Sequence, residues 1–127
     1  MMAIRRIFAV PVLLVLASTL LWAGTRWMDK VPAREHERTN PMAGNPDARL
    51  AGQLLFADHC AKCHGDDAEG KGKHPSLLSG RVQNEATPGD IHWLLVNGSL
   101  KRGMPSWSKL PDPQLWQLIS YIKSLSR

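Results

Sequence analysis

The sequence predicts an all-α fold, in which a small domain of three to four helices follows an apolar N-terminal segment. Apolar residues recur at helical spacing near the C-terminus, and capping signals for helix starts occur at three positions. Nowhere in the 127 residues do apolar and polar residues alternate as in a half-buried strand, and no internal repeat is present.

The N-terminus carries a candidate membrane anchor. Arg5 and Arg6 precede an uncharged, mostly apolar stretch from Ile7 to Thr25. At ~1.5 Å per helical residue this stretch approaches the ~30 Å hydrocarbon thickness of a bilayer. A cleaved signal peptide has a shorter apolar region and small residues at its cleavage site, and the best site, after Ala23, has Leu21 where a small residue is preferred.

We therefore expect residues 1–27 to form a retained signal anchor with one transmembrane helix. The alternative is a soluble periplasmic protein after signal cleavage. The arginines favour a cytoplasmic N-terminus, so both alternatives place the remaining chain outside the cytoplasmic membrane of a bacterium.

Residues 28–45 are polar and rich in proline, which predicts a flexible linker, and residues 46–127 then form the folded domain. A domain of this size is marginal on its hydrophobic core alone and usually depends on a disulfide, a metal or a cofactor. The net charge of +5 is spread along the chain without a basic run, so we expect no nucleic-acid partner.

The motif Cys60-Ala61-Lys62-Cys63-His64 contains both cysteines of the chain. C-x-x-C-H is the attachment signature of c-type haem. Two thiols three positions apart lie on one side of a helical turn, where each can add to one haem vinyl group. The histidine that follows is then placed to bind the iron. The motif thus predicts one covalent haem c.

Three helices of the domain have recognisable starts. Asn45-Pro46, Thr87-Pro88 and Asp112-Pro113 each place a capping residue or an acid beside a proline in the first turn. Asn97-Gly98 is typical of a helix end. The last helix has the strongest amphipathic pattern, formed by Leu115, Leu118, Ile119, Ile122 and Leu125.

The glycine-rich segment from Gly65 to Gly80 is a loop that we expect to fold back beneath His64. A metal-bound histidine usually donates its second ring N–H to a carbonyl or a carboxylate. The carbonyl of Pro75 is our candidate acceptor. Leu77, and Leu78 beside it, would then cover the haem edge.

Met104 is the candidate second ligand of the iron. It lies in a loop between two predicted helices, between Gly103 and Pro105, and not on an apolar helix face where a methionine fills the core. A Met opposite a His is a known haem pair. The competitors are His74, which shares a loop with His64, and His92, which we expect at the surface of a helix.

Trp107 follows the Met104 loop and is the candidate donor of an indole N–H to a haem propionate. Plain core packing is the alternative. Lys101 and Arg102 are further candidates for pairing with the propionates. The alternative is that both side chains are simply solvated at the surface.

Taken together, these features resemble the class I (mono-haem) c-type cytochromes. The resemblance covers Asn45 to Leu125, and the features in family order are Gly52, Phe56, Cys60-x-x-Cys63-His64-Gly65, Pro75-x-Leu77, Gly80, Asn97-Gly98, Gly103-Met104-Pro105, Trp116 and Tyr121. It implies that the first and last helices cross near Gly52, Phe56 and Tyr121. It also implies that Pro75 accepts from His64. An anchor and a linker before the domain resemble the membrane-tethered members of the family.

An iron held by both His64 and Met104 has no open position, so we expect electron transfer and no catalysis on a small-molecule substrate. The expected role is a carrier on the periplasmic side of the membrane, with redox proteins as donor and acceptor in a respiratory or dehydrogenase chain. The alternative is a dedicated cytochrome subunit of a membrane dehydrogenase or terminal oxidase. More distant alternatives are a thiol–disulfide oxidoreductase, a zinc site, and a five-coordinate haem sensor or peroxidase.

Overall fold

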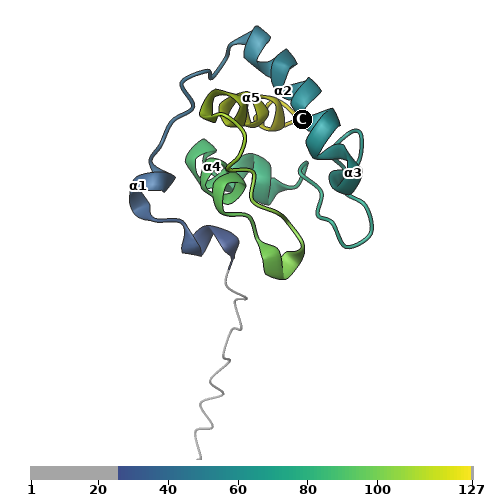
Figure 1. Ribbon diagram of the computed structural model, residues 1–127. Coiled ribbons are helices and arrows are strands. Elements are labelled where there is room, and N and C mark those ends of the chain that lie inside the picture. The colour runs from purple at the N-terminus through teal and green to yellow at the C-terminus, as the bar shows by residue number, and fades with distance from the viewer. Residues whose placement is uncertain (1–25, 127) are drawn as a thin grey trace, which may run out of the picture.

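The computed structural model describes residues 26–126, in which every regular element is a helix and no strand occurs (Figure 1). The only bridge pairs of this region are isolated ones, between Lys71 and His74 and between Ser99 and Met104. The all-α prediction is therefore confirmed for this part of the chain. The elements are η1 (Trp27–Lys30), α1 (Ala33–His36), α2 (Pro46–His59), α3 (Ala61–His64), η2 (Arg81–Glu85), α4 (Pro88–Asn97), η3 (Leu100–Arg102) and α5 (Asp112–Lys123).

All three predicted helix starts are present, and two of them have side-chain caps that are local in sequence, whereas α5 begins after Pro111 without one. Asn45 accepts hydrogen bonds from the backbone N–H groups of Asp47 and Ala48 at the start of α2. Thr87 and Asp90 form a reciprocal capping box on α4. Helix α4 ends at Gly98, whose φ of +67° favours glycine.

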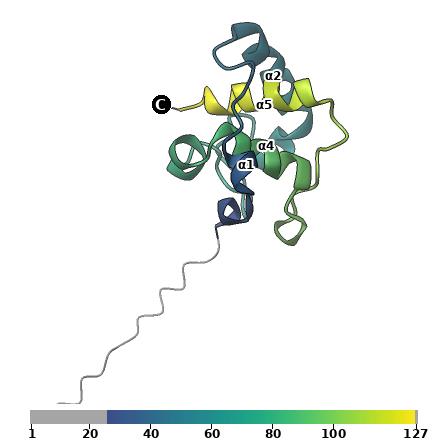
Figure 2. The same ribbon diagram turned by 90° about the vertical axis from the view of Figure 1, so that its left-hand side faces the viewer.

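Helices α2 and α5 cross and form the main packing interface, as both views of the molecule show (Figures 1 and 2). Gly52 lies at the crossing, where an added Cβ would collide with the carbonyl oxygen of Gln117. Phe56 packs on Tyr121 with ring centroids 5.2 Å apart. The crossing implied by the resemblance is therefore present, and it fixes the end of α2 that leads into the C-x-x-C-H motif.

The structure differs from the expected flexible linker over residues 28–45. Residues 26–45, which we call the N-terminal strap, contain η1 and α1 and pack against α4 and α5. Asn40 is buried and donates to the Trp116 carbonyl at 3.1 Å and to Ser120 Oγ at 2.8 Å. These contacts are single polar pairs between segments far apart in sequence, so the polar composition of the strap did not reveal them.

Gly89 allows the strap to approach α4 closely, because a Cβ at this position would collide with the Glu35 carbonyl oxygen. Overpacking of this kind costs about 1–3 kcal/mol. We therefore expect Gly89→Ala to loosen the strap and to raise the rate of tryptic cleavage after Arg34 several-fold. Limited proteolysis followed by mass spectrometry measures this rate. An unchanged rate would show that the strap does not depend on this contact.

His92 is buried, with 4% of its surface exposed, and not at the surface as its sequence position suggested. Its Nδ1 lies 3.2 Å from the Arg38 guanidinium, and its Nε2 lies 2.6 Å from Asp112 Oδ1. Because a guanidinium only donates, Nδ1 accepts and Nε2–H donates to Asp112. The imidazole also stacks on Trp116, at 4.3 Å between centroids. His92 thus joins the strap to α4 and α5.

Asp112 gives this network a dependence on pH. Burial raises the pKa of its carboxyl, but hydrogen bonds from His92 and Trp116 outweigh burial, so the pKa lies below the ordinary 3.8. A lowered carboxyl pKa contributes stability above 3.8 that is lost as the pH falls through the lower folded-state value. We expect the melting temperature of Asp112→Asn to fall less steeply than that of the wild type as the pH is lowered below 3.8. Melting temperatures across an acid titration measure it.

The matched control is Asp58→Asn, an exposed carboxylate at the end of α2. Its acid profile should follow that of the wild type. If the Asp112→Asn profile also follows the wild type, the carboxylate does not link this network to pH.

No helix within residues 26–126 has the length and apolarity needed to cross a membrane. The expected anchor stretch from Ile7 to Thr25 lies outside the described residues.

Candidate functional site

The C-x-x-C-H motif lies at the junction of α2 and α3. Cys60 closes α2 and begins α3, and His64 is the last residue of α3. Gly65 follows with a φ of +89°, which turns the chain into the loop that begins there. Cys60, Cys63 and His64 are all partly exposed, and both cysteines are free thiols.

The loop after His64 folds back as expected, and it orients the imidazole. His64 Nδ1 lies 2.9 Å from the Pro75 carbonyl oxygen, so Nδ1–H donates and Nε2 remains available as a metal ligand. Two backbone hydrogen bonds hold the loop in place, from Gly70 N to His64 O at 2.6 Å and from Leu77 N to Ala68 O at 2.8 Å. The structure thus brings Pro75 to His64.

Burial, and secondarily the neighbouring Cys63, raise the pKa of the Cys60 thiol to about 11. Thiol–disulfide exchange needs a thiolate, and redox-active cysteines have a lowered pKa. The described residues also contain no strand, whereas the C-x-x-C redox motif is typical of a βαβ context. These observations speak against the thiol–disulfide alternative.

Met104 is held in a short, well-fixed loop. Ser99 and Met104 exchange two backbone hydrogen bonds, of 2.9 and 3.1 Å, across η3. Gly103 adopts a φ of +79°, and Trp107 N donates to the Leu95 carbonyl at 2.7 Å on the other side of the loop. The Met104 side chain is partly buried and packs against the core. The loop therefore restricts where the thioether can point.

Trp107 is partly buried and packs against His59, with ring centroids 5.2 Å apart. Lys109 Nζ lies 5.8 Å above the indole ring. The contact with His59 was not foreseen, because the two residues lie on elements far apart in sequence. The expected hydrogen bond from Trp107 to a propionate stays a prediction.

The competing histidine ligands differ in their availability. Both ring nitrogens of His92 are hydrogen-bonded, so this residue is not free to bind a metal. His74 is partly exposed and its backbone pairs with Lys71. Within residues 26–126 no group of three or more His, Cys, Asp or Glu side chains is arranged to hold a metal ion.

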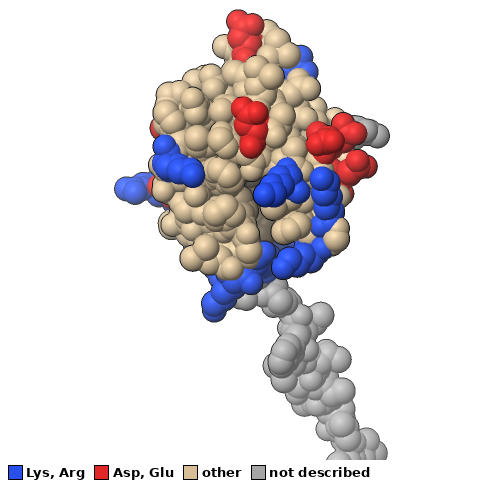
Figure 3. Space-filling model, turned by 45° about the vertical axis from the view of Figure 1, so that its right-hand side comes forward, with Lys and Arg blue, Asp and Glu red and all other residues tan. Residues whose placement is uncertain are grey.

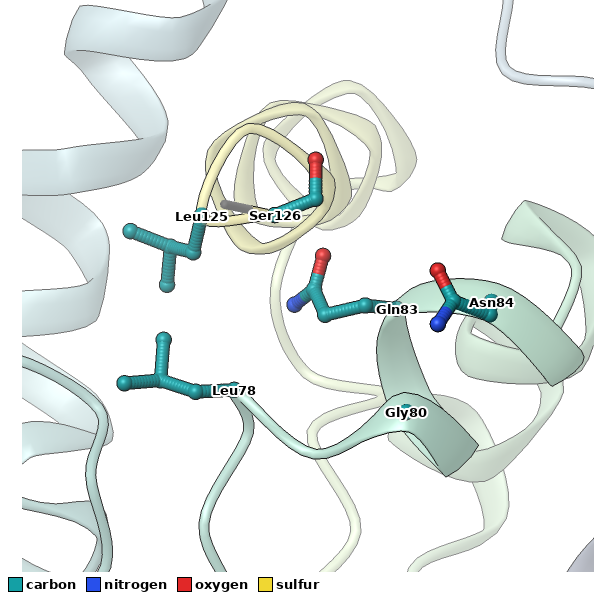
Figure 4. A pocket seen from close by; sticks show the side chains of 6 residues that line it. All are labelled: Leu78, Gly80, Gln83, Asn84, Leu125 and Ser126. Carbon is teal, nitrogen blue, oxygen red and sulfur yellow. The ribbon is translucent and has the colours of Figure 1, made fainter.

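Gln83 and Lys123 connect η2 to α5, which no motif or periodicity of the sequence indicates. Gln83 Nε2 donates to the carbonyls of Leu77 and Ile122, at 2.7 and 3.0 Å. Lys123 Nζ donates to three carbonyls of the η2 segment. A shallow hollow of about 140 Å³ lies beside Gln83, between Leu78 and Leu125 (Figure 4). These contacts place the segment that carries Leu77 against the C-terminal helix.

The donor set fits a covalent haem. It offers two free thiols on one helical turn, an imidazole whose Nδ1 is already hydrogen-bonded, and a thioether in a constrained loop. Several apolar side chains that pack against the core are only partly buried, among them Leu55, Leu77, Val82, Met104, Trp107 and Leu110.

Residues 47–122, more than half of the chain, match the family described as cytochrome c oxidase, cbb3-type, subunit III. The chain belongs to this family. It is a mono-haem c-type cytochrome, which binds haem c covalently and transfers electrons.

Curated relatives of the cytochrome include the cbb3-type cytochrome c oxidase subunit CcoP of Rhodobacter capsulatus, 37% identical over 66% of this chain and 32% of the relative. Cytochrome c550 of Pseudomonas aeruginosa is 29% identical over 80% of this chain and 69% of the relative. The chain thus spans only 28–32% of the length of the CcoP and FixPc relatives. Cytochrome cL of Methylophaga aminisulfidivorans has the same fold, with a TM-score of 0.61 at 23% identity, covering 69% of this chain and 59% of that structure.

Proposed function

We propose that this cytochrome is a membrane-tethered periplasmic electron carrier whose haem iron is bound by His64 and Met104. The observation that carries the ligand assignment is the hydrogen bond from His64 Nδ1 to the Pro75 carbonyl. It fixes the ring orientation and leaves Nε2 as the only nitrogen able to bind iron. Cys60 and Cys63 hold the macrocycle on the same helical turn as this imidazole.

Haem c supplies a one-electron Fe(III)/Fe(II) couple. The chain's own residues determine its surroundings: Pro75 holds the imidazole, the Ser99–Met104 pairing restricts the thioether, and Leu77 and Trp107 shield the site from water. Two protein ligands would leave no iron position open to a substrate, so the site is suited to outer-sphere transfer between redox proteins.

The tether rests on the sequence before Arg26, where Ile7–Thr25 is long and apolar enough to span a bilayer and follows Arg5-Arg6. The resulting topology puts residues 26–127 in the periplasm of a bacterium. Cleavage of this segment to give a soluble periplasmic carrier is the alternative.

A second candidate is a dedicated cytochrome subunit of a membrane oxidase. It is favoured by the family match and by CcoP and FixPc relatives, which are named as subunits of cbb3-type oxidases. The two candidates differ in one property. A subunit co-purifies with an oxidase at fixed stoichiometry in mild detergent, whereas a carrier separates from it.

The proposal is tested by the spectrum and location of the matured protein. We expect a covalent c-type spectrum with the weak red charge-transfer band of methionine ligation in the oxidised state, and an N-terminus that retains the apolar stretch. Haem that is removed by acid extraction would contradict covalent attachment. A mature N-terminus near Gly24 would contradict the membrane tether and favour the alternative, a soluble periplasmic carrier.

A further inference from the structure

One end of the molecule combines apolar and basic side chains around a hollow. The hollow, of about 320 Å³, lies between η1, the end of α4 and η3, and its lining includes Trp27, Lys30, Trp93, Leu100, Lys101 and Arg102. We call this surface the η1/η3 face. Leu100 is 82% exposed, the most exposed of the large apolar side chains among residues 26–126. Both ribbon views place η1 and η3 at the same end of the domain (Figures 1 and 2).

Charge is distributed unevenly relative to this face. In the space-filling view, Lys and Arg side chains gather at the lower end, where the described chain begins, whereas the visible Asp and Glu side chains lie at the top, in the middle and at the right-hand edge, among further Lys and Arg side chains (Figure 3). Two acidic residues near the start of the strap, Asp29 and Glu85, are both engaged by Arg26: Asp29 accepts from its backbone N–H at 3.0 Å, and Glu85 pairs with its guanidinium at 2.6 Å. The hydrogen bond to Asp29 leaves its charge in place, but Lys30, Lys101 and Arg102 line the hollow with three positive charges against this one carboxylate, so the face is net positive.

The chain connectivity places the same face beside the membrane. The apolar stretch ends at Thr25, and η1 begins at Trp27, so two residue steps, or ~7 Å of extended chain, separate them. The strap does not lengthen this connection, because Arg26 pairs with Glu85 and the strap packs on α4 and α5. A domain joined in this way cannot turn the η1/η3 face far from the bilayer surface.

We infer that the η1/η3 face rests on the headgroup layer of the membrane and binds anionic phospholipid there. Tryptophans with one wet edge occur at membrane interfaces, and lysine and arginine near the surface attract anionic lipid. Trp27 and Trp93 meet the first requirement, and Lys30, Lys101 and Arg102 the second, with Leu100 as an apolar contact between them. This inference rests on the proposed membrane anchor.

The test uses the full-length, haem-loaded protein reconstituted in vesicles of phosphatidylcholine with or without phosphatidylglycerol. Trypsin cleavage after Lys101 and Arg102 reports access to the face. We expect this cleavage to be about tenfold slower on the anionic vesicles than on neutral ones, and to recover in high salt. Cleavage after the exposed Lys62 and Lys73 should be equal on both.

The key variant is Leu100→Glu, which places a negative charge at a highly exposed position of the face and should remove the difference between the two lipids. The matched control is Leu54→Glu, because Leu54 is also an exposed leucine, 71% accessible, but lies on α2 at the other end of the domain. It should leave the difference intact.

Equal cleavage on both lipids, while the protein still floats with the vesicles, would overturn the lipid-binding face and leave the anchor standing. Protection in native membranes but not in pure lipid vesicles would assign the face to a protein partner and also overturn the inference. A protein that does not float with either vesicle would instead show that the anchor proposal has failed.

Discussion

Under the proposed ligation by Met104, we expect Met104→Leu to lower the reduction potential and to open the iron to carbon monoxide. Leucine keeps the volume and apolarity of the side chain but has no sulfur to bind iron. Loss of the thioether removes a ligand that favours Fe(II), so we expect a fall on the order of 0.1–0.2 V, a fraction of the roughly 0.8 V span over which axial ligands set haem potentials. Spectroelectrochemical titration measures the potential, and a shift of the reduced Soret band under carbon monoxide reports the open position.

Met42→Leu is the control for this experiment. Met42 lies in the N-terminal strap and is also partly buried against the core, so its substitution changes packing without affecting the proposed iron ligand. Its potential and its resistance to carbon monoxide should match the wild type. If Met104→Leu also matches the wild type, another residue binds the iron, and the partly exposed His74 becomes the first residue to examine.

Gly52→Ala disrupts the crossing of α2 and α5. The new Cβ would collide with the Gln117 carbonyl oxygen and lie 3.0 Å from Tyr121 Cβ, so the helices must separate. We expect a loss of about 3 kcal/mol in the free energy of unfolding, reduced by up to ~1 kcal/mol because alanine favours a helix over glycine. This is a large part of the ~5–15 kcal/mol by which domains are stable. Urea unfolding of the holoprotein measures it.

Gly80→Ala is the matched control, since its Cβ would meet Asn84 Nδ2 at an ordinary 3.5 Å and its φ of −55° suits any residue. Its stability should stay within about 0.5 kcal/mol of the wild type. Should Gly52→Ala unfold at the same urea concentration as this control, the helix crossing would have to tolerate the methyl group by a shift that costs little.

Features encoded by neighbouring residues could be predicted from the sequence. Asn45 and Thr87 cap helices through atoms two or three residues away, and Pro75 reaches His64 through a loop of only eleven positions. Each is a short-range interaction that one segment specifies by itself. The helix starts and the Pro75 contact therefore follow from local sequence, whereas the crossing of α2 and α5 was implied by the family resemblance.

Features that depend on distant partners could not be predicted in this way. The strap is held by Asn40 on Trp116 and by Arg38 on His92, contacts that span 76 and 54 positions. Its polar composition is typical of a linker, since one hydrogen bond leaves no periodic trace in a sequence. His92 was misplaced for the same reason, because its burial depends on Asp112 and Arg38 from other segments.

The packed strap has a consequence for the kinetics of electron transfer. A flexible tether of this length would have an r.m.s. end-to-end distance of ~25 Å. The effective concentration of the domain near the membrane would then be lowered, because the domain could occupy the whole of that volume. With residues 26–45 folded onto α4 and α5, a tethered domain keeps a nearly constant height above the membrane and searches in two dimensions. Under the proposed anchor, lateral diffusion of the two proteins and the height of the partner's redox centre would then set the encounter rate.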